Sequence, residues 1–294
     1  MYCIYTNREV PQNKGNWDHV IPLSLGGSNA FCVWSDVGFN SEMGSRVDGA
    51  IANDFLVQIL RQRNDARGHS NRPVEPVWRK STMNDRPVQV KFPADVTQPI
   101  QVWDAKAGAN IEEADLAGQP LTSEHRISID DNLRFLAKVA LGAGQFILQE
   151  EFRTGVDCNE LRGLLAFRRS DEKTHHAVKS SKLIIAHRFD PTLANSDQGK
   201  MYQAACRRTP GTSLVIMQKH KGYLSFHLGI LGEFMGSVFC PSTSSLWPIS
   251  NEDQGVVLEL TKGQVTRHTL LEWFKAWHDE LGKEEGQGTA SSDA

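Results

Sequence analysis

The feature that most constrains this chain is the stretch WDHVIPLSLGG at residues 17–27. Residues 17–21 are predicted to form a short strand, because the proline that follows cannot donate to a sheet and the glycine pair favours a turn. A second strand is predicted over residues 30–34 and a helical run over residues 45–63, where apolar side chains recur at helical spacing. The first part of the chain is therefore expected to fold as strand, loop, strand and helix.

Four polar residues stand at the joints of this arrangement. Asp18 and His19 are adjacent on the first predicted strand, Asn29 precedes the second strand, and Asn40 lies at the helix entrance. Phosphodiester cleavage needs an activated water and a cation that stabilises charge on the phosphate. A neutral imidazole can serve as the base, and carboxylate and amide oxygens suit a hard divalent cation. The alternative is that the Asp-His pair is simply polar strand surface.

The polar residues belong to a longer pattern, which consists of DHVIP at residues 18–22, LGG at residues 25–27, Asn29 and Asn40. This pattern resembles the HNH endonuclease family, whose nuclease domain has the ββα-metal fold, and the resemblance covers the first quarter of the chain. It implies that His19 is the general base and that Asn29 braces the loop that fixes His19. It also implies that Asp18 and Asn40 hold Mg²⁺ or Mn²⁺.

One part of the family pattern is missing. Many HNH proteins carry two CxxC pairs that hold a structural zinc, and the matching positions here are Cys3, Thr6, Asp36 and Phe39. Only one of these four can supply a thiolate, whereas a tetrahedral structural site needs four good ligands. We therefore expect no structural zinc, with Phe39 contributing apolar packing instead.

Basic residues gather after the predicted helix. They are Arg61, Arg63, Arg67, His69 and Arg72. Such a stripe is typical of phosphate contacts, and we predict it as the nucleic-acid-binding surface. The alternative is an ordinary solvated helix end whose positive charges complement the helix dipole.

Composition limits the setting of this site. A chain of 294 residues with 39% apolar content can bury a sizeable core and is expected to form two domains. Its formal charge of −3 means that a DNA-binding surface must be a local patch. No apolar run is long enough for a membrane span, and the first residues lack the layout of a signal peptide. Five scattered cysteines do not form a disulfide framework, so a cytoplasmic location is expected.

The fold class expected for the whole chain is α+β, with the ββα-metal domain followed by a mostly antiparallel α+β domain. The predicted divisions are a nuclease domain at 1–80, a linker with short strands at 81–122, an α+β specificity or regulatory domain at 123–281, and a disordered tail at 282–294. Ser128 is predicted to cap a long helix, and Thr269 with Glu272 a last one.

The long helix after Ser128 carries Arg134 and Lys138 four residues apart. They are interpreted either as phosphate contacts or as a solvated edge. The helix resembles a segment seen in some HNH-containing defence proteins, which implies a restriction or antiviral setting.

Together these features predict a metal-dependent HNH endonuclease that hydrolyses DNA phosphodiester bonds in a prokaryotic or phage restriction or defence system. The C-terminal domain is expected to select the substrate or control cleavage. The alternative is a protein that binds nucleic acid or a partner on a degenerate ββα scaffold without cleaving. RNA as a substrate and a homodimeric state are left open.

Overall fold

The chain begins with two short hairpins in the computed structural model, which describes residues 1–95, 97–168, 170–243 and 254–288. The elements of this part are β1 (Tyr2–Cys3), β2 (Arg8–Glu9), η1 (Gln12–Lys14), β3 (Gly15–His19), η2 (Leu23–Leu25) and β4 (Cys32–Asp36). β1 pairs with β2, and β3 pairs with β4, both antiparallel. The strand–loop–strand arrangement predicted around residues 17–34 is therefore present.

The helical part that follows differs from the single run predicted over residues 45–63. It consists of α1 (Val37–Met43), a π-helical turn (Gly44–Asp48), α2 (Gly49–Ala52) and α3 (Phe55–Arg63). It starts early because the Asp36 carboxylate accepts a hydrogen bond from the Phe39 amide at 3.0 Å and caps α1. It is interrupted because Asp54 caps α3 in the same way, through the amides of Leu56 and Val57.

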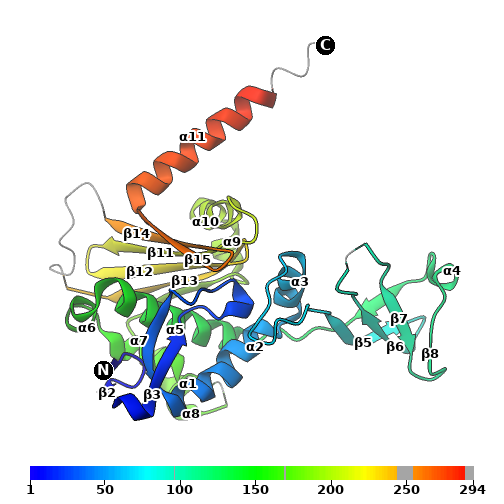
Figure 1. The fold of residues 1–294 in the computed structure, drawn as a ribbon, viewed down its shortest axis with the longest axis horizontal. Coiled ribbons are helices and arrows are strands. Elements are labelled where there is room, and N and C mark those ends of the chain that lie inside the picture. The colour runs from blue at the N-terminus through cyan, green and yellow to red at the C-terminus, as the bar shows by residue number, and fades with distance from the viewer. Residues whose placement is uncertain (96, 169, 244–253, 289–294) are drawn as a thin grey trace.

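The interval predicted as a linker with short strands at 81–122 lies within a small sheet. Its elements are β5 (Val77–Met83), β6 (Arg86–Lys91), β7 (Gln101–Asp104), β8 (Ala109–Asn110), α4 (Glu113–Leu116) and β9 (Leu121–Ser123). The strands form an antiparallel sheet in the order β8-β7-β6-β5-β9. One face buries a core of its own, made of Met83, Val88, Val90 and Val102. Figure 1 shows this sheet standing to one side of the rest of the molecule.

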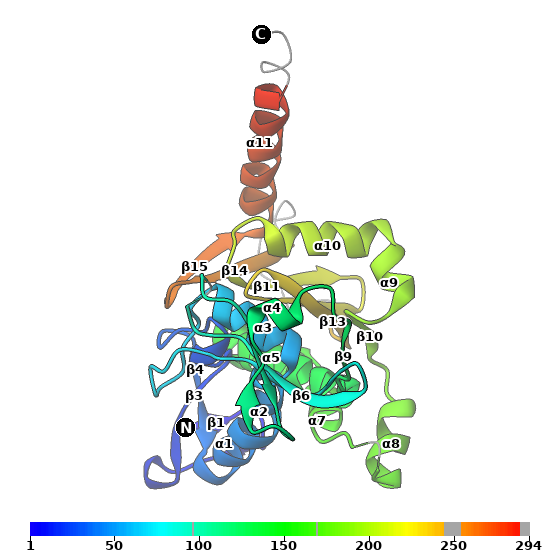
Figure 2. The same ribbon diagram turned by 90° about the vertical axis from the view of Figure 1, so that its right-hand side faces the viewer.

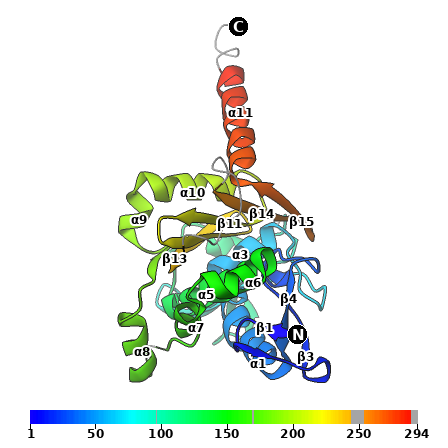
Figure 3. The same ribbon diagram turned by 90° about the vertical axis from the view of Figure 1, so that its left-hand side faces the viewer.

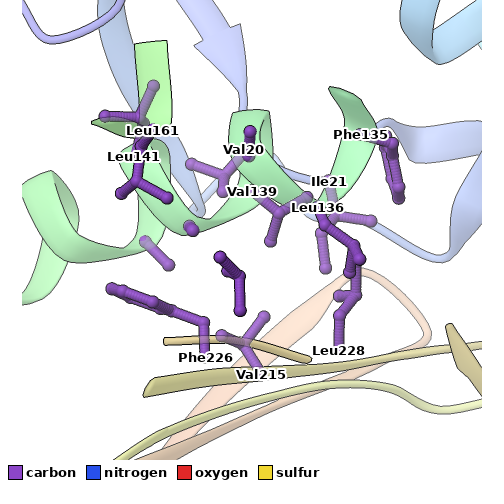
Figure 4. Close-up of a cluster of buried hydrophobic side chains, with 14 of the residues drawn as sticks. Val20, Ile21, Phe135, Leu136, Val139, Leu141, Leu161, Val215, Phe226 and Leu228 are labelled. Carbon is purple, nitrogen blue, oxygen red and sulfur yellow. The ribbon is translucent and has the colours of Figure 1, made fainter. Parts of the chain in front are cut away.

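Helices form the middle of the molecule. They are α5 (Ile129–Leu148), α6 (Glu150–Gly155), α7 (Cys158–Leu165) and α8 (Glu172–Lys179). As predicted, Ser128 caps α5, and its hydroxyl accepts from the Asp131 amide at 3.2 Å. α5 is apolar on nearly all sides and is buried between the β3–β4 hairpin and a large sheet (Figures 3 and 4).

The large sheet has six strands. They are β10 (Ile184–His187), β11 (Ser213–His220), β12 (Tyr223–Ile230), β13 (Glu233–Pro241), β14 (Gly255–Thr261) and β15 (Gln264–Thr269). Their order is β10-β13-β12-β11-β14-β15, and every neighbouring pair is antiparallel. α9 (Pro191–Asn195), α10 (Asp197–Arg207) and α11 (Leu270–Gly288) lie on the side away from α5 (Figure 2). This arrangement is the mostly antiparallel α+β fold that was predicted.

Buried side chains connect the first part of the chain with α5 and the large sheet. One cluster of buried side chains includes Val20 and Ile21 of the hairpin segment, Leu136 of α5, and Val215 and Phe226 of the large sheet (Figure 4). The apolar face of the hairpin segment is too small to bury itself, so it packs on α5. The first and last parts of the chain therefore share one core, and the small sheet is the separate unit.

The last helix follows its predicted cap. Thr269 Oγ1 accepts from the Glu272 amide at 3.2 Å, and the Thr269 amide donates to the Glu272 carboxylate at 3.4 Å, which is a capping box. The helix continues to Gly288, into the region predicted as a disordered tail, because residues 283–285 are strong helix formers. Residues 289–294 of that tail lie outside the described residues. Among the residues that are described, no helix is long and apolar enough to cross a membrane.

Candidate active site on the β3–β4 hairpin

The loop between β3 and β4 determines where Asn29 lies. β3 ends at His19, and Pro22 precedes the η2 turn. Gly26 ends that turn with a φ of 78°, a left-handed conformation that glycine adopts easily. Gly27 passes so close to the chain that an added Cβ would lie 1.7 Å from the Ile21 carbonyl oxygen. The glycine pair therefore folds the loop tightly back towards the strand that carries His19.

This loop brings His19 and Asn29 together. His19 Nε2 lies 2.8 Å from Asn29 Oδ1, and the Cys32 thiol donates to the Asn29 backbone carbonyl at 3.4 Å. Because the amide oxygen only accepts, Nε2 carries the proton, and in a neutral ring Nδ1 is left with its lone pair. His19 is half-buried, and the exposed His69 lies beside it with 5.6 Å between the ring centroids. The orientation suits a base that takes a proton on Nδ1.

Asp18 lies on the opposite side of the same strand. Its side chain is buried, and both carboxylate oxygens lie 3.3 Å from Nζ of Lys138 on α5. The same ammonium donates to the His19 carbonyl oxygen at 3.0 Å and to Asp48 Oδ2 at 2.7 Å. Lys138 is fully buried, so this group of Asp18, Asp48 and Lys138, which we call the buried triad, is enclosed by protein.

Burial controls the charges of the triad. For Lys138, burial alone would lower the pKa, but the carboxylates of Asp48 and Asp18 outweigh it and raise the pKa above its usual value. Burial raises the pKa of Asp48 to about 6, against the opposing effect of Lys138. Burial and the same two carboxylates raise the pKa of the nearby Tyr5 hydroxyl well above its ordinary range. Lys138 therefore stays charged at neutral pH and carries the positive charge of the cluster.

Asn40 lies within α1 rather than before a helix. Its side-chain amide donates to Asn16 Oδ1 at 2.9 Å, which joins α1 to strand β3. Asn16 is on the same side of the strand as Asp18, two residues away. The hairpin and α1 are thus connected through a pair of asparagine side chains that are open to solvent.

The side chains in this arrangement do not fit the divalent metal that the resemblance implies. Asp18 is enclosed and bound to an ammonium, and the Asn40 amide is directed to Asn16. Within the described part of the chain, no three His, Cys, Asp or Glu side chains come together as a metal-binding group. A hydrated Mg²⁺ needs several oxygen ligands and room for its waters, and the enclosed carboxylate offers neither.

The predicted basic stripe is divided by the fold. Arg61 donates to the Ala52 carbonyl at 2.9 Å, and burial lowers its pKa, so it serves the packing of α3. Arg63 lines a separate cavity of about 410 Å³, together with Arg188 and Arg207. These two arginines are therefore not brought to His19.

The remaining basic residues of the stripe follow α3. Arg67 pairs with Asp65 at 2.6 Å and donates to the Asn71 carbonyl, which shapes the loop that carries His69. Arg72 is exposed on the same segment. Of the five predicted residues, Arg67 and His69 are the two that the contacts link to the His19 side of the hairpin.

Three of the four positions that correspond to a zinc site contact other parts of the protein. Cys3 is buried with its thiol towards Ser35, and Asp36 caps α1 and pairs with Arg8 at 2.8 Å. Phe39 stacks on Tyr5 with 5.4 Å between the ring centroids. Apolar packing and one ion pair connect β1, β4 and α1 at these positions.

Lys138 and Asp48 were missed as part of the site. Arg134 and Lys138 had been interpreted as phosphate contacts or a solvated edge, and both interpretations were wrong, because the two side chains are buried. A signal was present in the sequence: Lys138 is the only charged residue between positions 135 and 148, in an otherwise largely apolar helix. A lone charge in such a helix indicates a buried, paired group.

Comparisons of this chain with protein-family models, with curated proteins and with solved structures found no match. The geometry of the hairpin is therefore what supports a functional conclusion.

Proposed function

We propose that this protein is a nuclease of the HNH type that hydrolyses DNA phosphodiester bonds with His19 as the general base. The observation that carries the proposal is the 2.8 Å contact between His19 Nε2 and Asn29 Oδ1 on a β-hairpin that leads directly into a helix bearing Asn40. Strand, loop, strand and helix occur here in the order that the sequence pattern implies.

The chemistry assigned to these residues is a proton transfer. Nδ1 of His19 accepts a proton from the attacking water, whose oxygen bonds to phosphorus as the bond to the leaving oxygen breaks. Asn29 holds the ring so that Nδ1, and not Nε2, meets the water. His69 lies close enough to His19 to reach the same phosphate. The leaving oxygen takes up a proton as its bond to phosphorus breaks.

Dependence on Mg²⁺ or Mn²⁺ stays a prediction of the sequence resemblance. In the present arrangement Asp18 is held by Lys138, so a metal at Asp18 would require the carboxylate to be released first. No step is therefore assigned to a metal.

A second candidate is a protein that binds nucleic acid on this scaffold without cleaving it. The burial of Asp18 against Lys138 favours this candidate, because it removes the one carboxylate that the pattern offers as a ligand. The pairing of His19 with Asn29 opposes it, because simple binding does not need an oriented imidazole.

Plasmid cleavage separates the two candidates. Wild-type protein is incubated with DNA and Mg²⁺, Mn²⁺ or EDTA, beside His19→Ala and the control His278→Ala, whose histidine is exposed on α11. We expect the wild type and the control to cut and His19→Ala to be slower by 10²–10⁴-fold, the usual contribution of a general base.

The outcomes differ clearly. A folded His19→Ala that cuts at the wild-type rate would contradict the assignment of the base. DNA binding without cutting under all three conditions would favour the non-cleaving protein.

A further inference from the structure

A hollow of about 750 Å³ lies beside the loop that positions His19. One wall is formed by Gly26 and Gly27 of that loop, and another by residues 64–67 with Asn71. The third wall comes from the large sheet, from the turns around Gly211, Leu231 and Lys262. The hollow therefore joins the hairpin, the segment after α3 and the ends of the β-hairpins of the large sheet.

The hollow is next to the candidate active site by chain connectivity. Gly27 is two residues from Asn29, which contacts His19. Arg67 and Asn71 flank His69, whose ring is 5.6 Å from that of His19. A nucleic-acid strand bound at His19 and His69 would therefore extend into this hollow.

The walls are fastened to one another. Ser213 Oγ on β11 donates to the Leu25 carbonyl at 2.7 Å and accepts from the Leu231 amide at 3.1 Å. Ser28 donates to the Gly263 carbonyl in the turn between β14 and β15. These contacts hold the loop and the sheet turns at fixed positions, so the hollow is a formed surface.

Unusual backbone geometry concentrates here. Among the described residues, eight non-glycine residues have a positive φ, and four of them line the hollow: Asp65, Asn71, Leu231 and Lys262. Residues held in such conformations cluster at functional sites. Lys262, with a φ of 49°, and Leu231, with a φ of 52°, each hold the first place of a two-residue hairpin turn that normally favours Asn, Asp or Gly.

Three charged residues line the hollow. Arg67 stands on the wall after α3 and Lys262 on the sheet wall, while Asp65, the acidic lining residue, already pairs with Arg67. Lys262 is exposed, and no ion pair to it is seen within the described part of the chain. Asp65, Arg67 and Lys262 give the lining a net charge of +1, which favours an anion although the whole chain carries −3.

We propose that this hollow binds the phosphodiester backbone of the DNA strand next to the bond that His19 attacks, with Lys262 as a phosphate contact. The inference rests on the proposed nuclease function and adds a binding residue from the large sheet. It gives the C-terminal part of the chain a direct role in holding the substrate.

The test is the salt dependence of binding by Lys262→Asn. Asparagine adopts the left-handed conformation readily, so the variant keeps the turn and loses only the charge. The matched control is Lys221→Asn, an exposed lysine in the turn between β11 and β12 at the opposite end of the same sheet. Fluorescence anisotropy measures the affinity for a short DNA duplex and for a single strand in the His19→Ala background, and circular dichroism confirms folding.

We expect Lys262→Asn to reduce the slope of log affinity against log salt by about 0.9 for a duplex or about 0.7 for a single strand. Lys221→Asn should leave the slope unchanged. Equal slopes for Lys262→Asn and the parent protein would overturn the proposal while leaving the cleavage result untouched.

A second arm identifies the source of the phosphate. A mononucleotide is titrated into the same proteins, and we expect weak binding with little effect of Lys262→Asn. If the substitution weakens mononucleotide binding but leaves DNA binding unchanged, the hollow is a small-ligand site and the proposal is wrong. If plasmid is not cut but the DNA slope still depends on Lys262, the hollow stands as a DNA site and the nuclease function alone fails.

Discussion

The two sides of strand β3 carry similar polar residues but hold them in opposite environments. His19 is half-buried beside Asn29 and His69, and Trp17 on the same side is 60% exposed. Asp18, one residue away, is only 5% exposed and belongs to the buried triad. Since neighbouring side chains of a strand point to opposite faces, one side is available for chemistry and the other for attachment to α5. Adjacent residues of one motif can therefore have separate roles.

The largest expected effect comes from removing the cation of the triad. Lys138→Met should lower the free energy of unfolding by about 3–5 kcal/mol, because it leaves two buried carboxylates without their partner. Urea denaturation measures the change, and Lys275→Met, an exposed lysine on α11, is the control with an expected change within about 0.5 kcal/mol. A loss for Lys138→Met as small as that of the control would mean that the triad does not attach the hairpin to α5.

The next prediction compares the two neighbours directly. Asp18→Ala should destabilise the fold by about 1.5–3 kcal/mol, since a hydrogen bond to a charged group is lost while Asp48 still holds Lys138. His19→Ala should change the free energy of unfolding by no more than about 0.5 kcal/mol. The measurement is again urea denaturation, on both variants. Equal losses for the two variants would remove the distinction between the two sides of the strand.

The remaining prediction is a pH dependence that arises on the buried side of the strand. Because burial raises the folded-state pKa of Asp48 to about 6, above its unfolded value, the folded protein binds more protons between about pH 4 and 6. The contribution of Asp48 to stability is therefore present below pH 4 and is lost as the pH rises through 6. One proton changes the free energy by at most about 1.4 kcal/mol per pH unit.

Comparing wild type with Asp48→Asn at each pH isolates this contribution from other titrating groups. The difference in unfolding free energy between the two proteins should vary across pH 4–6 and be flat above pH 7. A constant difference over the whole range would show that Asp48 does not titrate in this window.

Local signals in the sequence predicted local structure well. The strand break at Pro22, the cap at Ser128 and the capping box at Thr269 are all present, because each depends on residues within a few positions. The approach of Asn29 to His19 belongs to this class, since a tight loop with two glycines connects them. These features could be predicted because the chain needs no distant partner to form them.

The failures concern distant contacts. The burial of Lys138 depends on Asp18, which lies 120 residues earlier in the chain. A pair so far apart cannot be predicted from the periodicity of the sequence. The short strands predicted between residues 81 and 122 pair into one sheet, and their pairing with β5 and β9 could not be predicted because it joins positions up to 42 residues apart. The hairpin segment shares a buried core with α5 and the large sheet, and no local pattern in the sequence predicts this sharing.

The pairing of β5 with β9 has a consequence for how this chain could have been assembled. Ser81 pairs with Ser123, so the strand that enters the small sheet lies beside the strand that leaves it. A segment whose ends are neighbours can be inserted into a host fold, lengthened or exchanged without separating the parts that flank it. The β3–β4 hairpin and α5 would keep their shared core through such an exchange, which makes the small sheet the part of this protein that is freest to diverge.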